Sequence, residues 1–421
     1  MLTQAPKGTK DILPDEIQKW NYVGRRFTEL CSRFGYKEIR IPVFEHTELF
    51  QRGVGDTTDV VQKEMYTFED KGGRSITLRP EGTAGVVRSY IEHGMSSLPQ
   101  PVKLFYHITA YRYEKMQKGR YREFNQFGVE LFGAADPSAD AEVISLLSLY
   151  FESLGIKNLS LNLNSIGCPT CRKAYNELLK EYLRDKIDHM CETCQDRYNR
   201  NPMRIIDCKE DKCRNYVQEA PRLLDHICDE CRSHFEGLTR KLSAIGIPYV
   251  IDKSIVRGLD YYTKTVFEFV SQNIGTQGTV CGGGRYDGLV EICGGPPTPG
   301  IGFALGVERL LLEMESQNIT IPDAPNPDIY IGAIGDSAGL VCEKLAWQLR
   351  SKGISCIKDI MGRSVKAQMK YADKLGVRFS LIIGDTEVES NKAALRDMKT
   401  GETKDIHLDT LIDRLVKNKN A

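Results

Sequence analysis

The chain has 421 residues, of which 41% are hydrophobic and 27% are charged, values typical of a globular protein with a sizeable core. Lysine plus arginine and aspartate plus glutamate both number 57, so no overall basic charge favours nucleic acid, and any such binding must rest on local patches. Residues 1–20 lack the apolar core of a signal peptide, and no apolar run approaches the ~18 residues of a membrane span. We therefore expect a cytoplasmic protein without membrane contact.

The first elements are predicted from apolar spacing. Residues 16–36 have apolar positions at helical spacing and predict a helix. Residues 36–45 predict a strand that Pro42 interrupts, which indicates a sheet edge or boundary, a place where two subunits can meet. A short strand pair around 65–80 and a helix from Thr83 follow.

The middle of the chain begins with a hairpin and continues into a polar insertion. Residues 103–133 predict a long antiparallel hairpin with a basic loop and Gly119 at its tip. Residues 135–155 predict a capped helix, and 159–167 a strand. Residues 168–240 are polar and helical in character and hold eight of the thirteen cysteines, so we interpret them as an insertion.

The strand pattern resumes after the insertion. The apolar runs YVIDKSIV (249–256) and TVFEFV (265–270) predict two buried strands on either side of RGLDYYT (257–263). A glycine-rich turn and a helix at 301–314 come next. A linker with three prolines, 319–328, then indicates a domain boundary, and the alternating strands and helices beyond it predict a small α/β domain.

Three arginines stand among apolar residues and therefore need an anion nearby. They are Arg112 in the first arm of the hairpin, Arg257 in RGLDYYT, and Arg309 on the predicted helix. Each can form an ion pair with an acid such as Glu130 or Glu268, since a lone buried charge is strongly unfavourable. Together they favour a triphosphate, because the planar guanidinium binds phosphate oxygens with two parallel hydrogen bonds.

Two further stretches give weaker signals. CGGGRYDGLV (281–290) has consecutive glycines that let a backbone approach a ligand, but it fits neither the P-loop nor the dinucleotide fingerprint. A glycine-rich turn in a tight sheet explains it equally well. In LRPEGTAGVVR (78–88), Glu81 and Thr83 mark the change from strand to helix. They either cap the helix, with Thr83 as the cap, or hold a substrate ammonium.

The cysteines of the insertion have the spacing of metal ligands. They lie in CPTC (168–171), CETC (191–194), CKEDKC (208–213) and CDEC (228–231). Disulfides are disfavoured in the cytoplasm. Eight thiols suffice for one four-cysteine zinc site with spares or for two such sites, and buried free cysteines are the alternative. The sequence leaves the metal ligands, if any, unknown.

Several of these stretches resemble the motifs of class II aminoacyl-tRNA synthetases. The strand with Pro42 resembles the first motif, which forms the dimer interface, the hairpin around Arg112 resembles the second, and GIGFALGVERLLL with Arg309 resembles the third. RGLDYYT and TVCGGGRYDGLV resemble the two far more specific histidine signatures, and the opening KGTKDILP is typical of the same family. On these motifs the chain is identified as a member of the bacterial histidyl-tRNA synthetase family along essentially its whole length.

The resemblance implies a fold and a reaction. The fold is α/β (α+β): a class II antiparallel sheet core with helices over residues 1–325, the helical cysteine-rich insertion at 168–240, and an α/β anticodon-binding domain over 326–421. The reaction is that of a histidine–tRNA ligase, which activates L-histidine with ATP and Mg²⁺ to histidyl-adenylate and transfers the histidyl group to the 3′ end of tRNA(His), forming AMP and pyrophosphate. The implied assembly is a homodimer. No general base is evident, so catalysis would rest on positioning and electrostatics.

The roles of the family attach to this chain residue by residue. Arg112 would hold the ATP α-phosphate and the histidine carboxylate, Arg309 the ATP phosphates, and Arg257 the charge that develops on the α-phosphate. Arg120, in the hairpin loop, would contact ATP or the acceptor end of the tRNA. The histidine-binding residues implied are Glu81, Thr83 and Gln126 for the amino group, Glu130 and Tyr262 for the imidazole, and Tyr261 and Tyr286 for the shape of its pocket.

Two other classes of protein explain parts of the sequence. A non-catalytic paralogue, a regulatory subunit of the phosphoribosyltransferase that opens histidine biosynthesis, resembles the core but lacks the anticodon domain and usually degrades RGLDYY, and both are present here. A purely nucleic-acid-binding protein with a zinc ribbon leaves the histidine signatures unexplained. Adenylate formation without RNA separates the enzyme from the RNA-binding protein.

Overall fold

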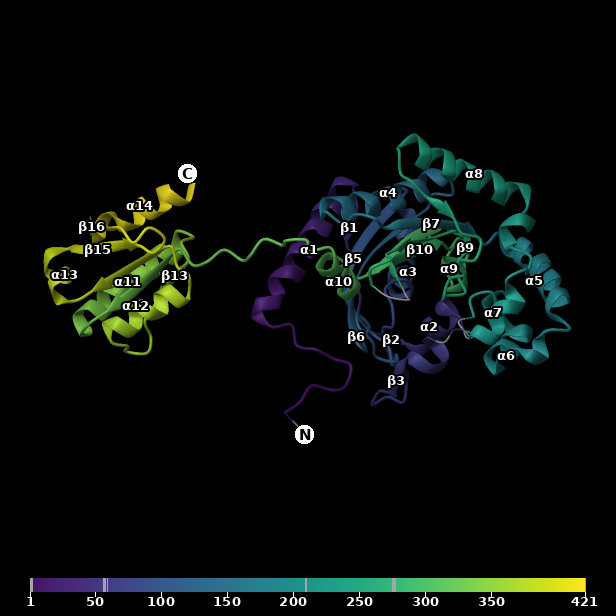
Figure 1. The fold of residues 1–421 in the computed structure, drawn as a ribbon, viewed down its shortest axis with the longest axis horizontal. Coiled ribbons are helices and arrows are strands. Elements are labelled where there is room, and N and C mark those ends of the chain that lie inside the picture. Colours follow the sequence, from purple (N-terminus) through teal and green to yellow (C-terminus); the bar gives the residue numbers. More distant parts are fainter. Residues whose placement is uncertain (1–2, 56–57, 59, 209, 275–277, 421) are drawn as a thin grey trace. The chain divides into compact units, whose positions relative to one another are not determined.

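The computed structural model describes residues 3–55, 58, 60–208, 210–274 and 278–420. The chain divides into two compact units, Met1–Ile321 and Pro322–Ala421, each built on its own central sheet (Figure 1). The division falls within the predicted proline-bearing linker, 319–328. Among the described residues, every helix is too short or too polar to cross a membrane.

The first unit is organised around a sheet of eight strands in the order β1-β5-β6-β11-β10-β9-β7-β8. Neighbours are antiparallel except at the two ends, where β1 is parallel to β5 and β7 is parallel to β8. The strands are β1 (Lys37–Glu38), β5 (Val102–Tyr111), β6 (Glu123–Phe132), β7 (Ser160–Ser165), β8 (Val250–Ile251), β9 (Thr263–Val270), β10 (Thr279–Arg285) and β11 (Gly300–Gly306). A small separate sheet holds β2 (Phe44–His46), β4 (Ser75–Leu78) and β3 (Tyr66–Glu69).

Two long helices pack on one face of the large sheet, and the cavity described below lies on the other face. Phe27 of α1 (Pro14–Arg33) stacks on Phe127 of β6 with 4.8 Å between ring centroids, and Tyr150 of α4 (Pro137–Ser153) donates a hydrogen bond to the Val23 carbonyl. Side chains alternate along a strand, so the neighbours of Phe127 face the opposite side. The remaining helices of this unit outside the insertion are α2 (Thr47–Val54), η1 (Val60–Glu64), α3 (Thr83–Glu92), η2 (Met95–Ser97), α9 (Leu289–Ile292) and α10 (Val307–Ser316). Of these, α3 packs on the same face as the cavity, where its Tyr90 stacks on Phe132 with 4.5 Å between ring centroids.

The insertion is helical, as predicted, and shares the core of the first unit. Its helices gather at the β7 end of the sheet (Figure 1). They are α5 (Pro169–Leu183), η3 (Ile187–His189), α6 (Glu192–Arg200), η4 (Pro202–Ile205), α7 (Asp211–Val217), η5 (Leu223–His226) and α8 (Asp229–Ala244).

The second unit has a five-stranded sheet in the order β13-β12-β14-β15-β16. The first three strands are parallel and the last two antiparallel. The elements are β12 (Ile329–Ala333), α11 (Asp336–Ser351), β13 (Cys356–Lys358), α12 (Val365–Lys374), β14 (Phe379–Ile383), α13 (Asp385–Ser390), β15 (Lys392–Asp397), β16 (Thr403–His407) and α14 (Leu408–Asn420). The sequence pattern missed the β15–β16 hairpin, whose exposed residues are polar apart from Ala394.

Two strand predictions are wrong in part. The strand predicted at 36–45 splits into β1 and β2, which belong to different sheets, because Pro42 interrupts the pairing between them. The buried strand predicted at 249–256 shrinks to β8, whose Val250 and Ile251 are 55% and 47% exposed. Asp252 ends it by accepting a hydrogen bond from the Ser254 amide, which turns the chain.

Two predictions around the glycine-rich stretch are also wrong. The first half of the helix predicted at 301–314 is the strand β11, and the helix α10 begins only at Val307. Ile301, Phe303 and Leu305 alternate with small residues, so a period of two was present in an apolar run that resembles a helix. The predicted glycine-rich turn is instead the middle of β10.

Candidate active site

The predicted site residues meet in one cavity of about 260 Å³ on the open face of the large sheet. Its walls come from β6, β10 and β11, the start of α3, the hairpin loop and the segment 257–263. The lining includes every predicted site residue except Glu130: Glu81, Thr83, Arg112, Arg120, Gln126, Arg257, Tyr261, Tyr262, Tyr286 and Arg309. Residues distant in the sequence therefore lie together around a single space.

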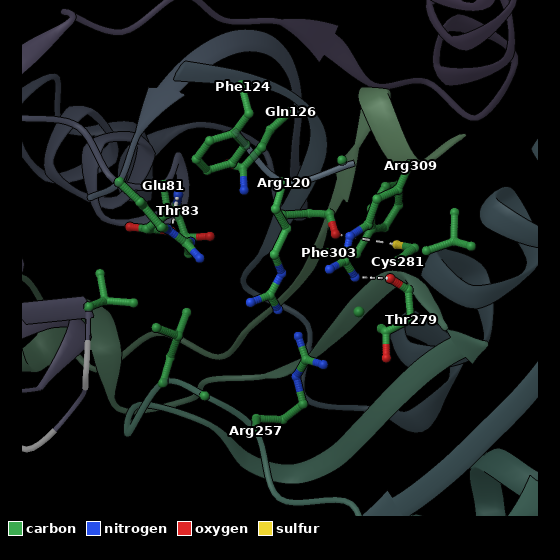
Figure 2. Close-up of a pocket in the computed structure, with 18 of the residues that line it drawn as sticks. Glu81, Thr83, Arg120, Phe124, Gln126, Arg257, Thr279, Cys281, Phe303 and Arg309 are labelled. Atoms are coloured by element: carbon green, nitrogen blue, oxygen red, sulfur yellow. Dashed lines mark hydrogen bonds between the residues drawn. The ribbon is translucent and has the colours of Figure 1, made fainter. Parts of the chain in front are cut away.

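Arginines surround this cavity from different elements. Figure 2 shows Arg120 and Arg257 between Glu81 and Thr83 on one side and Arg309 on the other. Backbone carbonyls fix two of the side chains: Arg112 Nε donates to the Pro80 carbonyl at 2.8 Å, and Arg309 Nη1 to the Thr279 carbonyl at 2.6 Å. Such anchoring holds the guanidinium groups in place before a ligand arrives.

Arg257 has the ion pair that we considered as the alternative to phosphate binding, and it faces the cavity as well. Its Nη1 donates to the Glu268 carboxylate, and its guanidinium carbon lies 5.5 Å from the centre of the Tyr262 ring. Burial lowers the pKa of Arg257, but Tyr262 and Glu268 outweigh burial and raise it overall. The side chain stays cationic, and its buried Nε has no hydrogen-bond partner among the described residues.

Positive charge is crowded at the Arg309 side of the cavity. Burial and the nearby charge of Arg120 lower the pKa of Arg309. Glu114 partly offsets this charge, because it lies 3.5 Å from Arg112 and 3.2 Å from Arg120. A polyanion would relieve the repulsion between these cations, so the electrostatics favour a ligand with several phosphates. Glu114, two residues after Arg112 in AYRYE, was a signal that the sequence interpretation did not use.

The opposite side of the cavity holds a carboxylate at the start of α3. Glu81 accepts hydrogen bonds from the Thr83 and Ala84 amides at 2.7 and 2.8 Å. The expectation of Thr83 as the cap is therefore wrong: Glu81 satisfies the helix amides, and Thr83 Oγ1 instead donates to Glu130 at 2.8 Å. Burial raises the pKa of Glu81. Gln126 contributes a buried Oε1 without a partner among the described residues, so an amide acceptor is available to a ligand.

Glu130 lies behind the cavity wall. Its carboxylate accepts hydrogen bonds from Thr83, from Tyr106 at 3.2 Å, and from Tyr286. The side chain is fully buried, and burial raises its pKa to about 8. Glu130 therefore fixes the hydroxyl groups of lining residues, and it is not itself a lining residue.

Three tyrosines form the apolar part of the wall. The ring of Tyr261 lies 4.7 Å from that of Tyr262 and 5.7 Å, edge to face, from that of Tyr286. Burial raises the pKa of all three hydroxyl groups, so they remain neutral hydrogen-bonding groups at neutral pH. Aromatic walls with hydroxyl groups suit a flat polar ring.

Glycines of β10 and β11 make room for these side chains. A Cβ on Gly282 would lie 2.3 Å from Arg257 Nη1, one on Gly284 would lie 2.9 Å from the Tyr262 ring, and one on Gly302 would lie 2.0 Å from the Glu130 carboxylate. Real Cβ atoms do not approach other atoms so closely. The glycines of β10 and β11 therefore let the side chains of Arg257, Tyr262 and Glu130 pack directly against the strand backbone. This close approach explains the glycines of CGGGRYDGLV better than a turn.

One charged residue of CGGGRYDGLV has a structural role. Arg285 is fully buried and pairs with Asp140 of α4 and with Asp287. His234 of α8 contacts the same Asp140 at 3.2 Å. This network, which the sequence interpretation missed, fixes β10 beneath the cavity.

Comparison with known proteins identifies the family. A family model described as "Histidyl-tRNA synthetase" matches residues 8–310. The chain belongs to the histidyl-tRNA synthetase family. A second model, "Anticodon binding domain", matches residues 328–418. The predicted family, the fold class and the predicted enzyme, a histidine–tRNA ligase, are thereby confirmed.

Relatives of this synthetase family match over nearly the full length. The histidine–tRNA ligase of Acetivibrio thermocellus is 68% identical over 415 residues, which cover 99% of this chain and 100% of the relative. That of Caldanaerobacter subterraneus is 56% identical over 418 residues, with 99% and 100% covered. The structure is similar to apo histidyl-tRNA synthetase of S. aureus, with a TM-score of 0.85 at 45% identity, covering 98% of this chain and 99% of that one.

The buried Glu130 makes the stability of this synthetase depend on pH. Between its ordinary pKa of 4.5 and its folded pKa of about 8, the folded chain keeps a proton that the unfolded chain loses. The free energy of unfolding therefore falls as pH rises through this window, by about 1.4 kcal/mol for each pKa unit at most. Glu130→Gln has no such proton. We therefore expect the melting temperature of Glu130→Gln, relative to that of the native chain, to be higher at about pH 9 than at about pH 5.

The control is Glu152→Gln, which removes an exposed carboxylate from α4. Thermal melts of the three proteins at both pH values check the expectation. A difference between Glu130→Gln and the native chain that is the same at both pH values contradicts it.

Proposed function

We propose that the cavity binds histidine and MgATP side by side and joins them as histidyl-adenylate. The observation that carries the proposal is that arginines, a buried carboxylate and tyrosines line one cavity. Arg309 lies across this cavity from Glu81 and Thr83, with Arg120 and Arg257 between them (Figure 2). The arginines suit phosphates, and the carboxylate and the tyrosines suit an ammonium group and a polar ring, so the space beside Arg257 is where a carboxylate and an α-phosphate would meet.

The proposed roles of the arginines follow from their anchoring. Arg309 would bind the outer phosphates of ATP, and Arg112 the α-phosphate together with the histidine carboxylate. Arg257 would stabilise the charge on the α-phosphate as the carboxylate oxygen attacks phosphorus and the bond to the β-phosphate breaks, releasing pyrophosphate. Arg120, on the hairpin loop, would contact ATP or the tRNA acceptor end. Mg²⁺ enters with ATP as part of the substrate.

The proposed histidine site uses the carboxylate, the amide and the tyrosines of the cavity. Glu81, Thr83 and Gln126 would hold the α-amino group, and Tyr262 the imidazole, while Tyr261 and Tyr286 shape the pocket. Glu130 would act on the imidazole through the hydroxyl groups that it orients. A pocket of paired polar groups rejects amino acids that leave those groups unsatisfied, and this would make the site selective.

The second step would transfer the histidyl group to tRNA(His). The terminal ribose hydroxyl of the tRNA would attack the adenylate carbonyl, and AMP would leave. Under this proposal residues 1–325 form the catalytic core, with the insertion at 168–240, and residues 326–421 bind the anticodon. The match of residues 328–418 to an anticodon-binding model supports the second assignment. A cytoplasmic location and a structural zinc in the insertion belong to the same proposal.

We also propose that two copies associate through the segment that contains Pro42. Val43 and Phe44 in this segment are 43% and 56% exposed, and an apolar surface of this kind is typical of an interface. We expect sedimentation equilibrium to give a dimer for the native chain and a weaker dimer for Phe44→Asp. A native chain that stays monomeric contradicts the interface.

The experiment that tests the proposed reaction is ATP–pyrophosphate exchange with each amino acid in turn, without tRNA. We expect exchange with histidine alone, because the adenylate forms before tRNA is needed. Folded protein that binds histidine but exchanges with no amino acid contradicts the proposal and favours the regulatory paralogue.

A further inference from the structure

The eight cysteines of the insertion converge in two groups of four. The first group is Cys168, Cys171, Cys228 and Cys231; the second is Cys191, Cys194, Cys208 and Cys213. Within each group all sulfur atoms lie within 4.8 Å of one another. All thirteen cysteines of the chain are free thiols in the structure. Each group therefore combines residues from separate stretches, which the spacing alone did not assign.

The distances fit a single tetrahedral ion in each group. A zinc ion with four Zn–S bonds of ~2.3 Å requires sulfur atoms about 3.8 Å apart. Cys168 and Cys171 Sγ are 3.5 Å apart, and Cys191 and Cys208 Sγ are 3.8 Å apart. In an iron–sulfur cluster the four cysteines are shared among two or more irons, so cysteine sulfur atoms bound to different irons would lie farther apart than in a site with one ion.

The backbone supports both groups as metal sites. Cys168, Cys191 and Cys228 each precede the first residue of a helix, α5, α6 and α8, and the second cysteine of each C-x-x-C pair lies in the first turn of that helix. Backbone amides also donate to sulfur: Cys228 N to Cys171 Sγ at 3.1 Å, and Cys191 N to Cys213 Sγ at 3.2 Å. Such hydrogen bonds stabilise and orient thiolate ligands of a metal.

We propose that the insertion binds two zinc ions, one in each four-cysteine group, and that these ions position the segment that carries Arg257. The first ion would join the start of the insertion to its last helix. The second would close the loop between Cys194 and Cys208. Both sites are structural, because four protein ligands leave no open position for a substrate.

The contacts that link the two sites to the segment of Arg257 end on Asp260 and on the Arg257 carbonyl. Next to the first site, Arg172 Nη1 donates to the Asp260 carbonyl at 3.3 Å. From the loop that the second site closes, Asn201 Nδ2 donates to Asp260 Oδ1 at 2.9 Å, and Arg204 Nη1 to the Arg257 carbonyl at 3.5 Å. The segment 257–260 thus rests on residues whose placement depends on both cysteine groups.

The test measures metal and activity separately in the full-length protein. We expect two zinc ions per chain by elemental mass spectrometry of protein purified without added metal. Cys228→Ser, at an exposed position, should reduce this to one, and Cys228→His should retain two, because histidine also binds zinc. Cys293→Ser, which removes a thiol outside both groups, is the matched control and should retain two.

The positioning role rests on the function proposed for Arg257, whereas the metal content does not. Asn201→Ala should keep two zinc ions and lower the kcat of pyrophosphate exchange about 10-fold, with a smaller change in KM for ATP. Cys228→Ser should lose activity in the same way, and Cys228→His should recover it.

Each of the following results would overturn all or part of the proposal. Native protein without any metal, or with disulfides in either group, excludes the metal sites, and iron in place of zinc excludes the assignment of zinc, whatever the activity. Zinc content unchanged in Cys228→Ser excludes the first group as a site. Full activity of Asn201→Ala excludes the positioning role, but it does not contradict the two zinc sites.

Discussion

Replacement of Arg257 by histidine is expected to lower ATP–pyrophosphate exchange about 10²- to 10³-fold, the cost of losing one group that stabilises a transition state. Arg257 faces the cavity beside Tyr262, and Glu268 holds it in a fixed orientation. Because the proposed role concerns charge that develops during the reaction, kcat should fall more than KM for ATP changes.

Two controls separate this role from a loss of structure. Glu268→Gln removes the ion pair and keeps the arginine, so the exchange rate should fall less than in Arg257→His. Arg74→His removes an exposed arginine that pairs with Asp70 outside the cavity, and it should exchange at the native rate. An unchanged rate in Arg257→His, or an equal fall in Arg74→His, contradicts the assigned role.

A single methyl group at Gly282 is expected to lower the exchange rate about 100-fold, since displacement of a catalytic group by ~1 Å has costs of this size. The added Cβ would lie 2.3 Å from Nη1 and 2.4 Å from Nη2 of Arg257, so the guanidinium must move. The guanidinium is the far end of a flexible side chain, so the backbone need not move, and the melting temperature should fall much less than the exchange rate.

Gly288→Ala is the matched control, because the same stretch provides a glycine whose added Cβ would have no heavy atom within 4 Å. Steady-state exchange and thermal melts of both variants test the expectation. A native exchange rate in Gly282→Ala shows that the glycine at this position is not needed to place Arg257. An equal fall of the exchange rate in both variants shows that the effect is not specific to Gly282.

Local patterns predicted the elements that are stabilised locally. The long hairpin, the helix from Thr83 and the capped helix α4 have turn, cap and period signals within their own sequence, and the structure has all three. The strand β11 resembles the start of a helix in sequence because its apolar run continues directly into α10. What makes it a strand is pairing with β6 and β10, which are remote in the sequence.

The sequence predicted which residues form the site, but it did not predict the contacts between them. The resemblance supplied the residues, and ten of the eleven line one cavity. Chemistry alone offered ion pairing and phosphate binding as alternatives for Arg257, whereas the structure shows the ion pair at the edge of the cavity. The placement of Glu130 behind Thr83 and Tyr286 depends on tertiary packing, which no spacing of residues indicates.

The order of strands in the large sheet has a consequence for synthesis on the ribosome. β5 and β6 pair with each other as soon as both have emerged, but the other edge of β6 pairs with β11. The whole insertion and four further strands must be translated before β11 appears. A nascent chain therefore carries an open, largely apolar strand edge while residues 133–299 are translated, and this edge is where we expect chaperones to bind and truncated chains to aggregate.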